Sequence, residues 1–181
     1  MTTDIIKTWE RFTGVLKIYK AHLLLNPPCA AEQIQELGKK FDLDFPSPLK
    51  SLLALNNGQR IDDEGIKKGV FKSVSGWDVY ERHIFLSLEE IKKAYKSFID
   101  DEVLVEEFGK DEIPFAIAVS PIAYSQIQYK EAFCINSSTG IVSLIWTQHI
   151  DFMNPPEWQV AKFKRAESLM EFIERQTELY R

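Results

Sequence analysis

Apolar residues recur at helical spacing along the first part of the chain. Steps of three and four residues predict a helix from Asp4 to Leu24 with one apolar face. That face carries Ile5, Trp9, Phe12, Leu16, Tyr19 and Leu23. Asn26-Pro27-Pro28 then interrupts the chain, and the same spacing predicts a shorter helix from Ala30 to Phe41. The chain therefore begins with two helices that each offer one face to a core.

The segment from Phe41 to Gly58 contains the helix with the clearest boundaries. Pro46 and Pro48 flank Ser47, so we expect an extended entry, Ser47 as the cap and Pro48 at the first helical position. The leucines between positions 49 and 55 provide a wide apolar surface. Asn56-Asn57-Gly58 is expected to end the helix, because Asn and Gly tolerate the left-handed backbone conformation of a helix C-terminus.

From residue 69 onward, short apolar or alternating runs replace the helical spacing. They predict strands at 69–75, at 77–80 with 83–86, at 113–119, at 132–135, at 141–147 and at 160–164. Ser87-Leu88-Glu89-Glu90 is a capping box that starts a helix between two of these strands, and residues 166–180 predict a closing helix. We therefore expect an α+β fold with N-terminal helices, a central and mainly antiparallel sheet, and a C-terminal helix packed on the sheet.

The length and composition fit one globular domain. A chain of 181 residues with 45% hydrophobic and 27% charged residues can bury a core unaided, so we treat residues 1–181 as a single domain. Cys29 and Cys134 lie far apart in unlike contexts, which predicts two buried thiols. Residues 1–12 lack the apolar region of a secretory signal, and no stretch is apolar for the length of a membrane span. These features predict a cytoplasmic protein that does not bind membranes.

Acidic residues are concentrated in one short window of the chain. Residues 100–112 hold seven acidic side chains against one lysine, a net charge of −6, so the rest of the chain carries +1 of the overall −5. A nearly neutral body with one acidic segment lacks the clustered Lys and Arg that bind phosphate backbones, which argues against nucleic acid. Two readings remain open, a solvated acidic loop and a surface for a basic protein partner.

The sequence carries no recognisable arrangement of catalytic or metal-binding residues. His22, His83 and His149 are widely separated, without the spacing of metal ligands. No nucleophile elbow, glycine-rich phosphate loop, EF-hand pattern or zinc-type cysteine pairing occurs. We therefore expect a non-catalytic protein without a cofactor or a metal. A hydrolase whose catalytic residues come from distant positions is kept as an alternative.

Several short motifs occur in an order that resembles the SUKH superfamily, and the resemblance covers roughly residues 30–176. The motifs are Phe45-Pro46, Asn57-Gly58, Leu86-Ser87-Leu88-Glu89-Glu90, Ile113-Pro114-Phe115-Ala116 and Phe133-Cys134-Ile135. The superfamily includes yeast cell-wall-synthesis regulators of the Smi/Knr type and many bacterial immunity proteins. Ser47-Pro48, Glu131 and Asn136 depart from its usual pattern, and Asn136 stands where the strand usually ends in Asp.

The resemblance implies a compact α+β binding domain. Bacterial members commonly bind and neutralise a cognate toxin, whereas yeast relatives act as scaffolds in cell-wall signalling. Our first hypothesis is an immunity protein, a monomer or weak dimer, that occludes a basic toxin domain. The expected contact residues are Asp62, Asp63, Glu64, Trp77, Asp100, Asp101, Glu102, Glu106 and Glu107. The alternative is a regulatory scaffold that docks partners through the N-terminal helix or its Trp9 face.

Overall fold

The computed structural model describes residues 2–60, 69–72, 82–118, 131–150 and 157–181. In chain order these residues form α1 (Thr2–Ile18), the 3-10 helix η1 (Ala21–Leu24), α2 (Ala31–Phe41), α3 (Ser47–Leu55), β1 (Phe71–Lys72), β2 (Arg82–Phe85), α5 (Leu88–Ile99), α6 (Glu102–Phe108), β3 (Glu112–Ala118), β4 (Glu131–Asn136), β5 (Val142–Ile150), β6 (Glu157–Ala166) and α7 (Leu169–Leu179). Helices come first, strands dominate the middle, and a helix closes the chain, which confirms the predicted α+β class.

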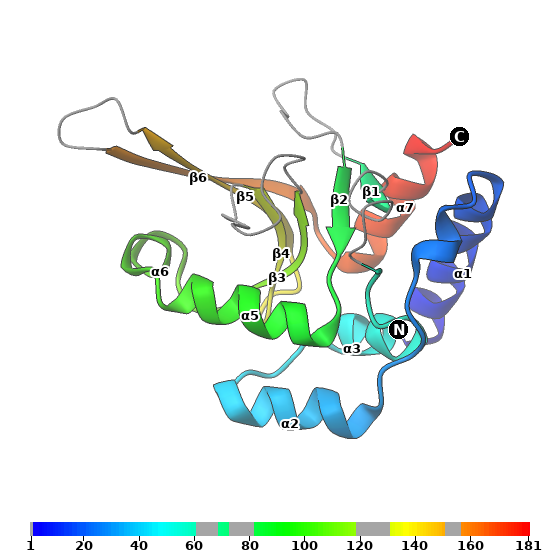
Figure 1. Ribbon diagram of the computed structural model, residues 1–181, viewed down its shortest axis with the longest axis horizontal. Coiled ribbons are helices and arrows are strands. Elements are labelled where there is room, and N and C mark those ends of the chain that lie inside the picture. The colour runs from blue at the N-terminus through cyan, green and yellow to red at the C-terminus, as the bar shows by residue number, and fades with distance from the viewer. Residues whose placement is uncertain (1, 61–68, 73–81, 119–130, 151–156) are drawn as a thin grey trace.

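The six described strands form one sheet in which sequence neighbours are also neighbours in space. Their order is β1-β2-β3-β4-β5-β6, and every pair is antiparallel (Figure 1). Every residue of β3 is buried, as expected for a strand that is covered on both faces. β6 lies at one edge of the sheet, as predicted for residues 160–164, but it is longer at both ends.

Aromatic rings from helices and strands meet in the core where α1 and α7 approach the sheet. The ring of Phe172 in α7 lies 5.3 Å from Phe71 of β1, 5.6 Å from Phe115 of β3 and 4.8 Å from Phe133 of β4, measured between centroids. Trp9 of α1 lies 6.5 Å from the same Phe71 ring. The C-terminal helix therefore packs on the sheet, as predicted, and α1 joins the same core.

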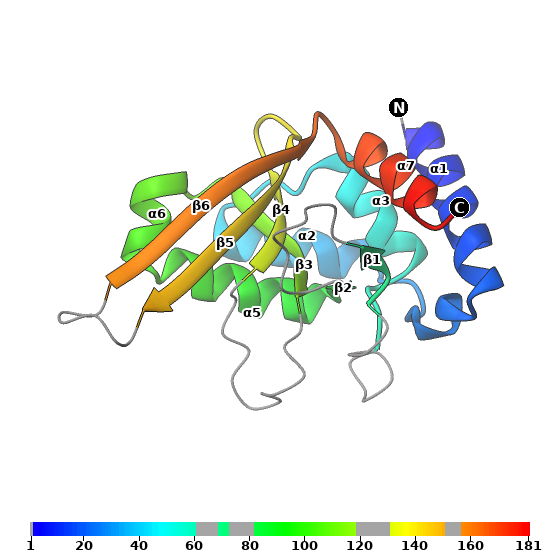
Figure 2. The same ribbon diagram turned by 90° about the horizontal axis from the view of Figure 1, so that it is seen from above.

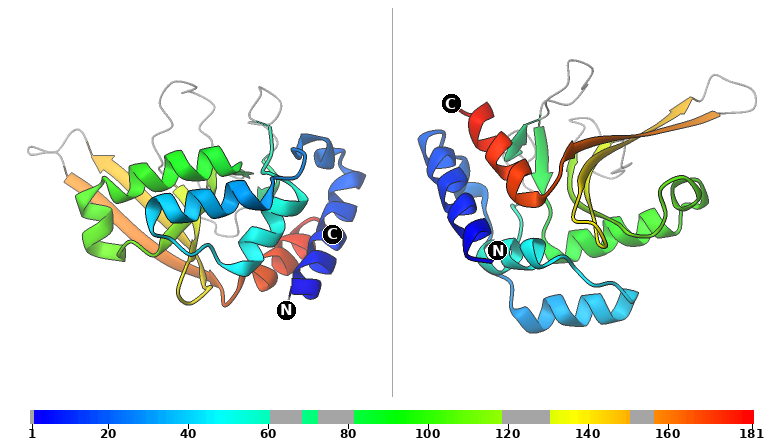
Figure 3. Two further views of the ribbon diagram at one scale, coloured as in Figure 1. Left: turned by 90° about the horizontal axis from the view of Figure 1, so that it is seen from below. Right: turned by 180° about the vertical axis from the view of Figure 1, so that it is seen from behind.

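The remaining helices extend the molecule along its longest axis. α5 and α2 lie next to one another below the sheet in Figure 1, and Figure 3 shows the same arrangement from below and from behind. The rings of Phe41 in α2 and Tyr95 in α5 are 5.5 Å apart. α6 lies at one end of the long axis and α1 and α7 lie at the other, in the views of both Figure 1 and Figure 2.

The Asn-Asn-Gly segment that ends α3 joins three helices. The Oδ1 atom of Asn56 accepts a hydrogen bond of 2.9 Å from the Trp9 indole of α1. The Oδ1 atom of Asn57 accepts one of 2.7 Å from the N–H of Leu88, the first residue of α5. Gly58 has a φ of 68°, and a Cβ there would lie 2.2 Å from the backbone nitrogen of Ser87. Two of the short motifs, Asn-Gly and Leu-Ser-Leu-Glu-Glu, are thus in direct contact.

The N-terminal helix is shorter than its apolar pattern predicted. α1 ends at Ile18, and Lys20 has a left-handed backbone with φ 58°, which turns the chain into η1. Tyr19 and Leu23 follow the apolar spacing but are 56% and 59% exposed, because the helix that would have directed them inward has ended. The first four positions of the stripe are buried as expected.

Two other local predictions are corrected. Ser47 is the first residue of α3 and Pro46 occupies the capping position, so Ser47 does not cap the helix and Pro48 is its second residue. One of the two readings of the acidic window was a solvated loop, but the window contains α6. The predicted strand at 69–75 is observed at Phe71–Lys72 and starts later than expected. Residues 73–81, which include the predicted strand at 77–80, lie outside the described part of the chain.

Among the described residues, none of the helices combines the length and the hydrophobicity that crossing a membrane requires.

Candidate functional site

The acidic window divides into carboxylates that support the fold and carboxylates that face solvent. The Asp100 carboxylate is paired with the Lys96 ammonium group one turn earlier. The Asp101 side chain caps α6, because its Oδ1 accepts a hydrogen bond of 3.2 Å from the N–H of Leu104. Glu102, Glu106 and Glu107 are exposed. They make no ion pair with any side chain in the described part of the chain.

The α6 helix forms because one of its faces is anchored. Leu104 is only 8% exposed and packs into the main core. Gly109 has a φ of 76° and donates its N–H to the carbonyl of Val105, which ends the helix. The Tyr95 hydroxyl of α5 donates a hydrogen bond of 2.9 Å to the next carbonyl, that of Lys110. Anchoring at both ends directs the three exposed glutamates outward.

An apolar side chain lies among these carboxylates. Val103 is 43% exposed, and its position in α6 is next to Glu102, three residues before Glu106 and four before Glu107. Positions three and four apart share one face of a helix. We call this group of Glu102, Val103, Glu106 and Glu107 the α6 surface. It combines three negative charges with a point of apolar contact.

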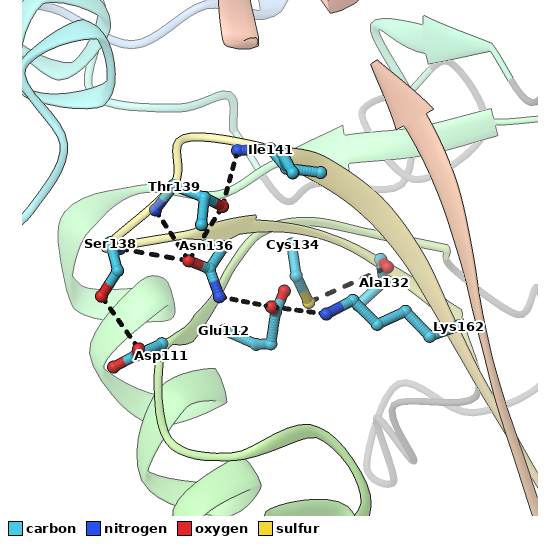
Figure 4. A network of polar contacts seen from close by, with 9 residues as sticks. All are labelled: Asp111, Glu112, Ala132, Cys134, Asn136, Ser138, Thr139, Ile141 and Lys162. Atoms are coloured by element: carbon cyan, nitrogen blue, oxygen red, sulfur yellow. Dashed lines mark hydrogen bonds and ion pairs between the residues drawn. The ribbon is translucent and has the colours of Figure 1, made fainter. Parts of the chain in front are cut away.

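A polar network connects the region after α6 to the far edge of the sheet (Figure 4). The Glu112 side chain, at the start of β3, is fully buried. Its Oε1 accepts hydrogen bonds of 2.8 Å from the Asn136 amide of β4 and 2.7 Å from the Lys162 ammonium group of β6. Its Oε2 has no hydrogen-bond partner among the described residues. A single buried carboxylate therefore ties β3 to β6 across two intervening strands.

The same network fixes the turn of the β4–β5 hairpin. Asn136 Oδ1 accepts hydrogen bonds from the backbone N–H groups of Ser138 and Thr139, at 3.1 and 2.9 Å. The Ser138 hydroxyl donates one of 2.9 Å to the carboxylate of Asp111. Gly140 accommodates a φ of 75° where the turn returns to β5. The hairpin predicted from the sequence is thus held against the end of α6.

Neither cysteine has the properties of a nucleophile. Burial raises the pKa of the Cys134 thiol well above its ordinary value, and the negative charge of Glu112 raises it further while Lys162 opposes this. Burial is also the main cause of the raised pKa of Cys29. Both thiols stay protonated near neutral pH, and the thiolate is the reactive form. Both are free and buried, as predicted.

A second buried polar pair escaped sequence reasoning. His83 of β2 and Glu131 of β4 are 0% and 3% exposed, and their Nε2 and Oε1 atoms are 3.0 Å apart. The His83 ring also lies 4.3 Å from that of Phe133, between centroids. Glu112 and Glu131 share one signal that could have been recognised, a carboxylate directly before a buried apolar run. No group of three or more metal-ligating side chains occurs within the described ranges.

Four of the expected contact residues cannot be related to the α6 surface. Asp62, Asp63 and Glu64 belong to residues 61–68, and Trp77 belongs to residues 73–81, both outside the described part of the chain. The structure therefore brings together only the members that come from the acidic window. Of those five, Asp100 and Asp101 already have partners within the fold.

Residues 28–175 match the SMI1 / KNR4 family (SUKH-1). This range agrees closely with the span over which the short motifs were found. A comparison with curated protein sequences finds no significant match. The matched range begins after α1, although Trp9 and Phe12 of that helix are part of the same core as the matched residues.

Proposed function

The chain belongs to the SMI1 / KNR4 family (SUKH-1), and from that premise we propose that it is an immunity protein that binds and neutralises a cognate toxin. It would act in the cytoplasm as a non-catalytic monomer or weak dimer, without cofactor or metal. Its partner would be a basic toxin domain rather than nucleic acid. Neutralisation would occur by occlusion, since a bound protein blocks access to the toxin's own site.

The observation that carries this proposal is the α6 surface. Its three carboxylates have no opposing charge among the described residues, so their attraction is available to a cationic partner. Such attraction accelerates encounter and discriminates between partners. Desolvated apolar contacts provide much of the affinity at a typical interface, and Val103 is positioned to make one. The protonated thiols described above agree with a role that involves no catalysis.

Contacts within the fold lead us to propose fewer binding residues than the sequence did. Asp100 and Asp101 pair with Lys96 and cap α6, so changing them would alter the helix as well as its charge. Glu102, Glu106 and Glu107 are exposed and make no ion pair among the described residues. We therefore assign partner binding to these three glutamates and keep the two aspartates as supports of the helix.

The test is a titration of the purified protein with the toxin domain encoded beside its gene. Replacing Glu102, Glu106 and Glu107 by Lys should weaken binding at least about tenfold, and should reduce the dependence of the Kd on salt. The control replaces Glu10, Glu32 and Glu36 by Lys, which changes the net charge equally on helices away from α6.

If both triple variants weaken binding to the same extent, net charge rather than the α6 surface accounts for the attraction. If neither variant affects binding, the site assignment is wrong. If the neighbouring gene product is no toxin and does not bind, the immunity role itself is contradicted.

The family also contains the alternative of a regulatory scaffold of the cell-wall-synthesis type. The version in which the Trp9 face docks a partner is contradicted, because Trp9 is 2% exposed and hydrogen-bonded to Asn56. The exposed end of α1 keeps a scaffold role open. Truncation before Ala30 would remove core residues, so we expect the shortened chain to lose its cooperative unfolding transition. A stably folded fragment would mean instead that α1 is an independent docking element.

A further inference from the structure

Three apolar side chains are exposed together where α1 meets η1. Ile18, Tyr19 and Leu23 are 76%, 56% and 59% exposed, the highest values among the large apolar side chains of the described residues. All three lie within six positions of the chain. A cluster of large exposed apolar groups on a soluble domain indicates an interaction surface, whereas a single one does not.

The chain turns at Lys20, between the end of α1 and the start of η1. Lys20 has φ 58° and ψ 9°, and a residue with a Cβ adopts this left-handed conformation at a cost in free energy. The apolar spacing would have continued the buried face of α1 through Tyr19 and Leu23. The left-handed turn ends that face instead, so that the Tyr19 ring lies 5.5 Å from the Tyr180 ring and Leu23 is left exposed in η1. Strained conformations of this kind concentrate at functional sites.

Lys17 and Lys20 adjoin Ile18 and Tyr19 in the chain, and Arg60 contacts Leu23. Lys17, Lys20 and Arg60 are exposed and make no ion pair with the described residues. Arg60 is held in place because its Nη2 donates a hydrogen bond of 2.8 Å to the carbonyl of Leu23. The Tyr19 hydroxyl is likewise bonded to the carbonyl of Tyr180, at 2.9 Å. We call the group of Lys17, Ile18, Tyr19, Lys20, Leu23 and Arg60 the α1–η1 surface.

We propose that the α1–η1 surface docks an acidic amphipathic helix of a second protein partner. Apolar groups with neighbouring cations, of which Arg60 is held by a hydrogen bond, complement a helix with one apolar stripe flanked by carboxylates. A protein partner fits better than an anionic membrane, because the chain carries a net charge of −5 and Arg60 and Tyr19 are held by hydrogen bonds. This inference goes beyond the toxin-binding role and does not depend on it.

The two surfaces have opposite charge and lie at opposite ends of the molecule. α6 is at one end of the long axis and α1 with η1 is at the other (Figures 1 and 2). Their separation allows two partners to bind at the same time without contact. A protein with this arrangement can bridge a basic partner and an acidic partner.

The test uses stapled helical peptides and the intact protein, followed by NMR. The first peptide has a leucine stripe flanked by glutamates, the second has lysines in place of the glutamates, and the third is a scrambled acidic sequence. We expect the acidic amphipathic peptide alone to bind, with chemical-shift changes at residues 17–23 and 60. The variant Ile18→Ser with Leu23→Ser should weaken binding at least about tenfold. Val103→Ser, which alters the α6 surface, should leave peptide binding unchanged.

Four outcomes would overturn the inference. One is equal binding of the scrambled peptide, and another is the absence of peptide binding. A third is binding to phosphatidylcholine–phosphatidylserine vesicles that the Ile18→Ser and Leu23→Ser changes abolish, which would identify a lipid surface. The fourth is concentration-dependent self-association in sedimentation, lost in the same variant, which would identify a second copy as the occupant. Circular dichroism establishes that the variant remains folded, as expected for exposed side chains.

Discussion

The two ends of the molecule are held together by different interactions. At the α1–α7 end, Trp9, Phe12, Phe71 and Phe172 are packed ring against ring and are at most 2% exposed. At the α6 end, only Leu104 of the helix is buried, and order comes from the Asp101 cap and the Glu112 network. Aromatic rings thus gather at one end, whereas the α6 end buries little of its helix and relies more on polar contacts.

The residues that stabilise the fold are therefore different from those that we propose to bind partners. Charged residues on a surface can be replaced without unfolding the protein when other residues provide the free energy of folding. The α6 surface meets this condition, because its glutamates contact none of the core. The α1–η1 surface shares the aromatic end; Ile18 and Leu23 are exposed there, whereas the Tyr19 ring packs against that of Tyr180. The predictions below test whether stability is indeed distributed in this way.

The largest loss of stability is expected at the centre of the aromatic end. Phe172→Ala removes a ring in contact with Phe71, Phe115 and Phe133 and should lower the free energy of unfolding by about 3–5 kcal/mol. Phe108→Ala, the matching change at a half-buried residue of α6, should lower the free energy of unfolding by clearly less. Urea denaturation followed by circular dichroism measures both. Equal losses would mean that the two ends contribute equally to stability, which would contradict the difference described above.

A smaller loss is expected at the junction between α3 and α5. Gly58→Ala would place a methyl group 2.2 Å from the Ser87 nitrogen, in a left-handed conformation, and should cost about 2–4 kcal/mol. Gly140→Ala in the β4–β5 turn is the control, because its φ of 75° is also positive but no atom lies within 4 Å of the added Cβ. A lower urea midpoint for Gly58→Ala than for the control is assigned to the contact with Ser87. If the two variants unfold alike, the contact between Gly58 and Ser87 is unimportant.

The elements with strong local signals could be predicted from the sequence. Ser87 and Glu90 form the predicted capping box, and α5 begins at Leu88 directly after it. The apolar runs before and after Asn136 formed the predicted hairpin. Each of these signals depends on residues within a few positions of one another, so a single sequence displays them.

Features that depend on distant residues could not be predicted in this way. Lys20 ends α1 by a backbone conformation that lysine does not usually adopt, so the apolar stripe appeared to continue. Asn56 and Asn57 marked the end of a helix, but their bonds to Trp9 and Leu88 depend on tertiary structure. α6 was missed because three of its 7 residues are glutamates and only Leu104 is well buried. The acidic window was recognised as a candidate site, but its division into supporting and exposed carboxylates required the fold.

Breaking the ion pair between Lys162 and the buried Glu112 should cause an intermediate loss of stability. Lys162→Met leaves the Glu112 carboxylate buried with Asn136 alone, which should cost about 1–3 kcal/mol, moderated because Lys162 is one-third exposed. Adding Glu112→Gln removes the unpaired charge and should recover part of the loss. Urea unfolding of both variants measures their free energies of unfolding. If the double variant is less stable than the single one, the network depends on the carboxylate itself and not on its pairing.

Alkaline pH should affect the polar end before the aromatic end. Burial holds the pKa of Cys134 well above the ordinary 9.0, so the folded thiol keeps a proton that the unfolded thiol releases above pH 9. Stability is therefore complete below pH 9 and falls above it, by about 1.4 kcal/mol per pH unit. Tyr180, whose pKa burial also raises, contributes only above its ordinary 10.0. Cys134→Ala should flatten the loss of unfolding free energy between pH 9 and 10, and Cys29→Ala should flatten it less.

The smallest effect is expected on the α6 surface itself, where two kinds of carboxylate can be compared within one short helix. Replacing Glu102, Glu106 and Glu107 by Gln should change the free energy of unfolding by no more than about 0.5 kcal/mol, because the side chains are exposed and unpaired among the described residues. Asp101→Ala removes a single charge but also the hydrogen bond to the Leu104 N–H, and should cost about 1 kcal/mol. Thermal unfolding of both variants at low and high salt measures the difference. A triple variant less stable than Asp101→Ala would mean that the exposed carboxylates stabilise the helix. The residues proposed to bind the partner would then also contribute to the stability of the fold.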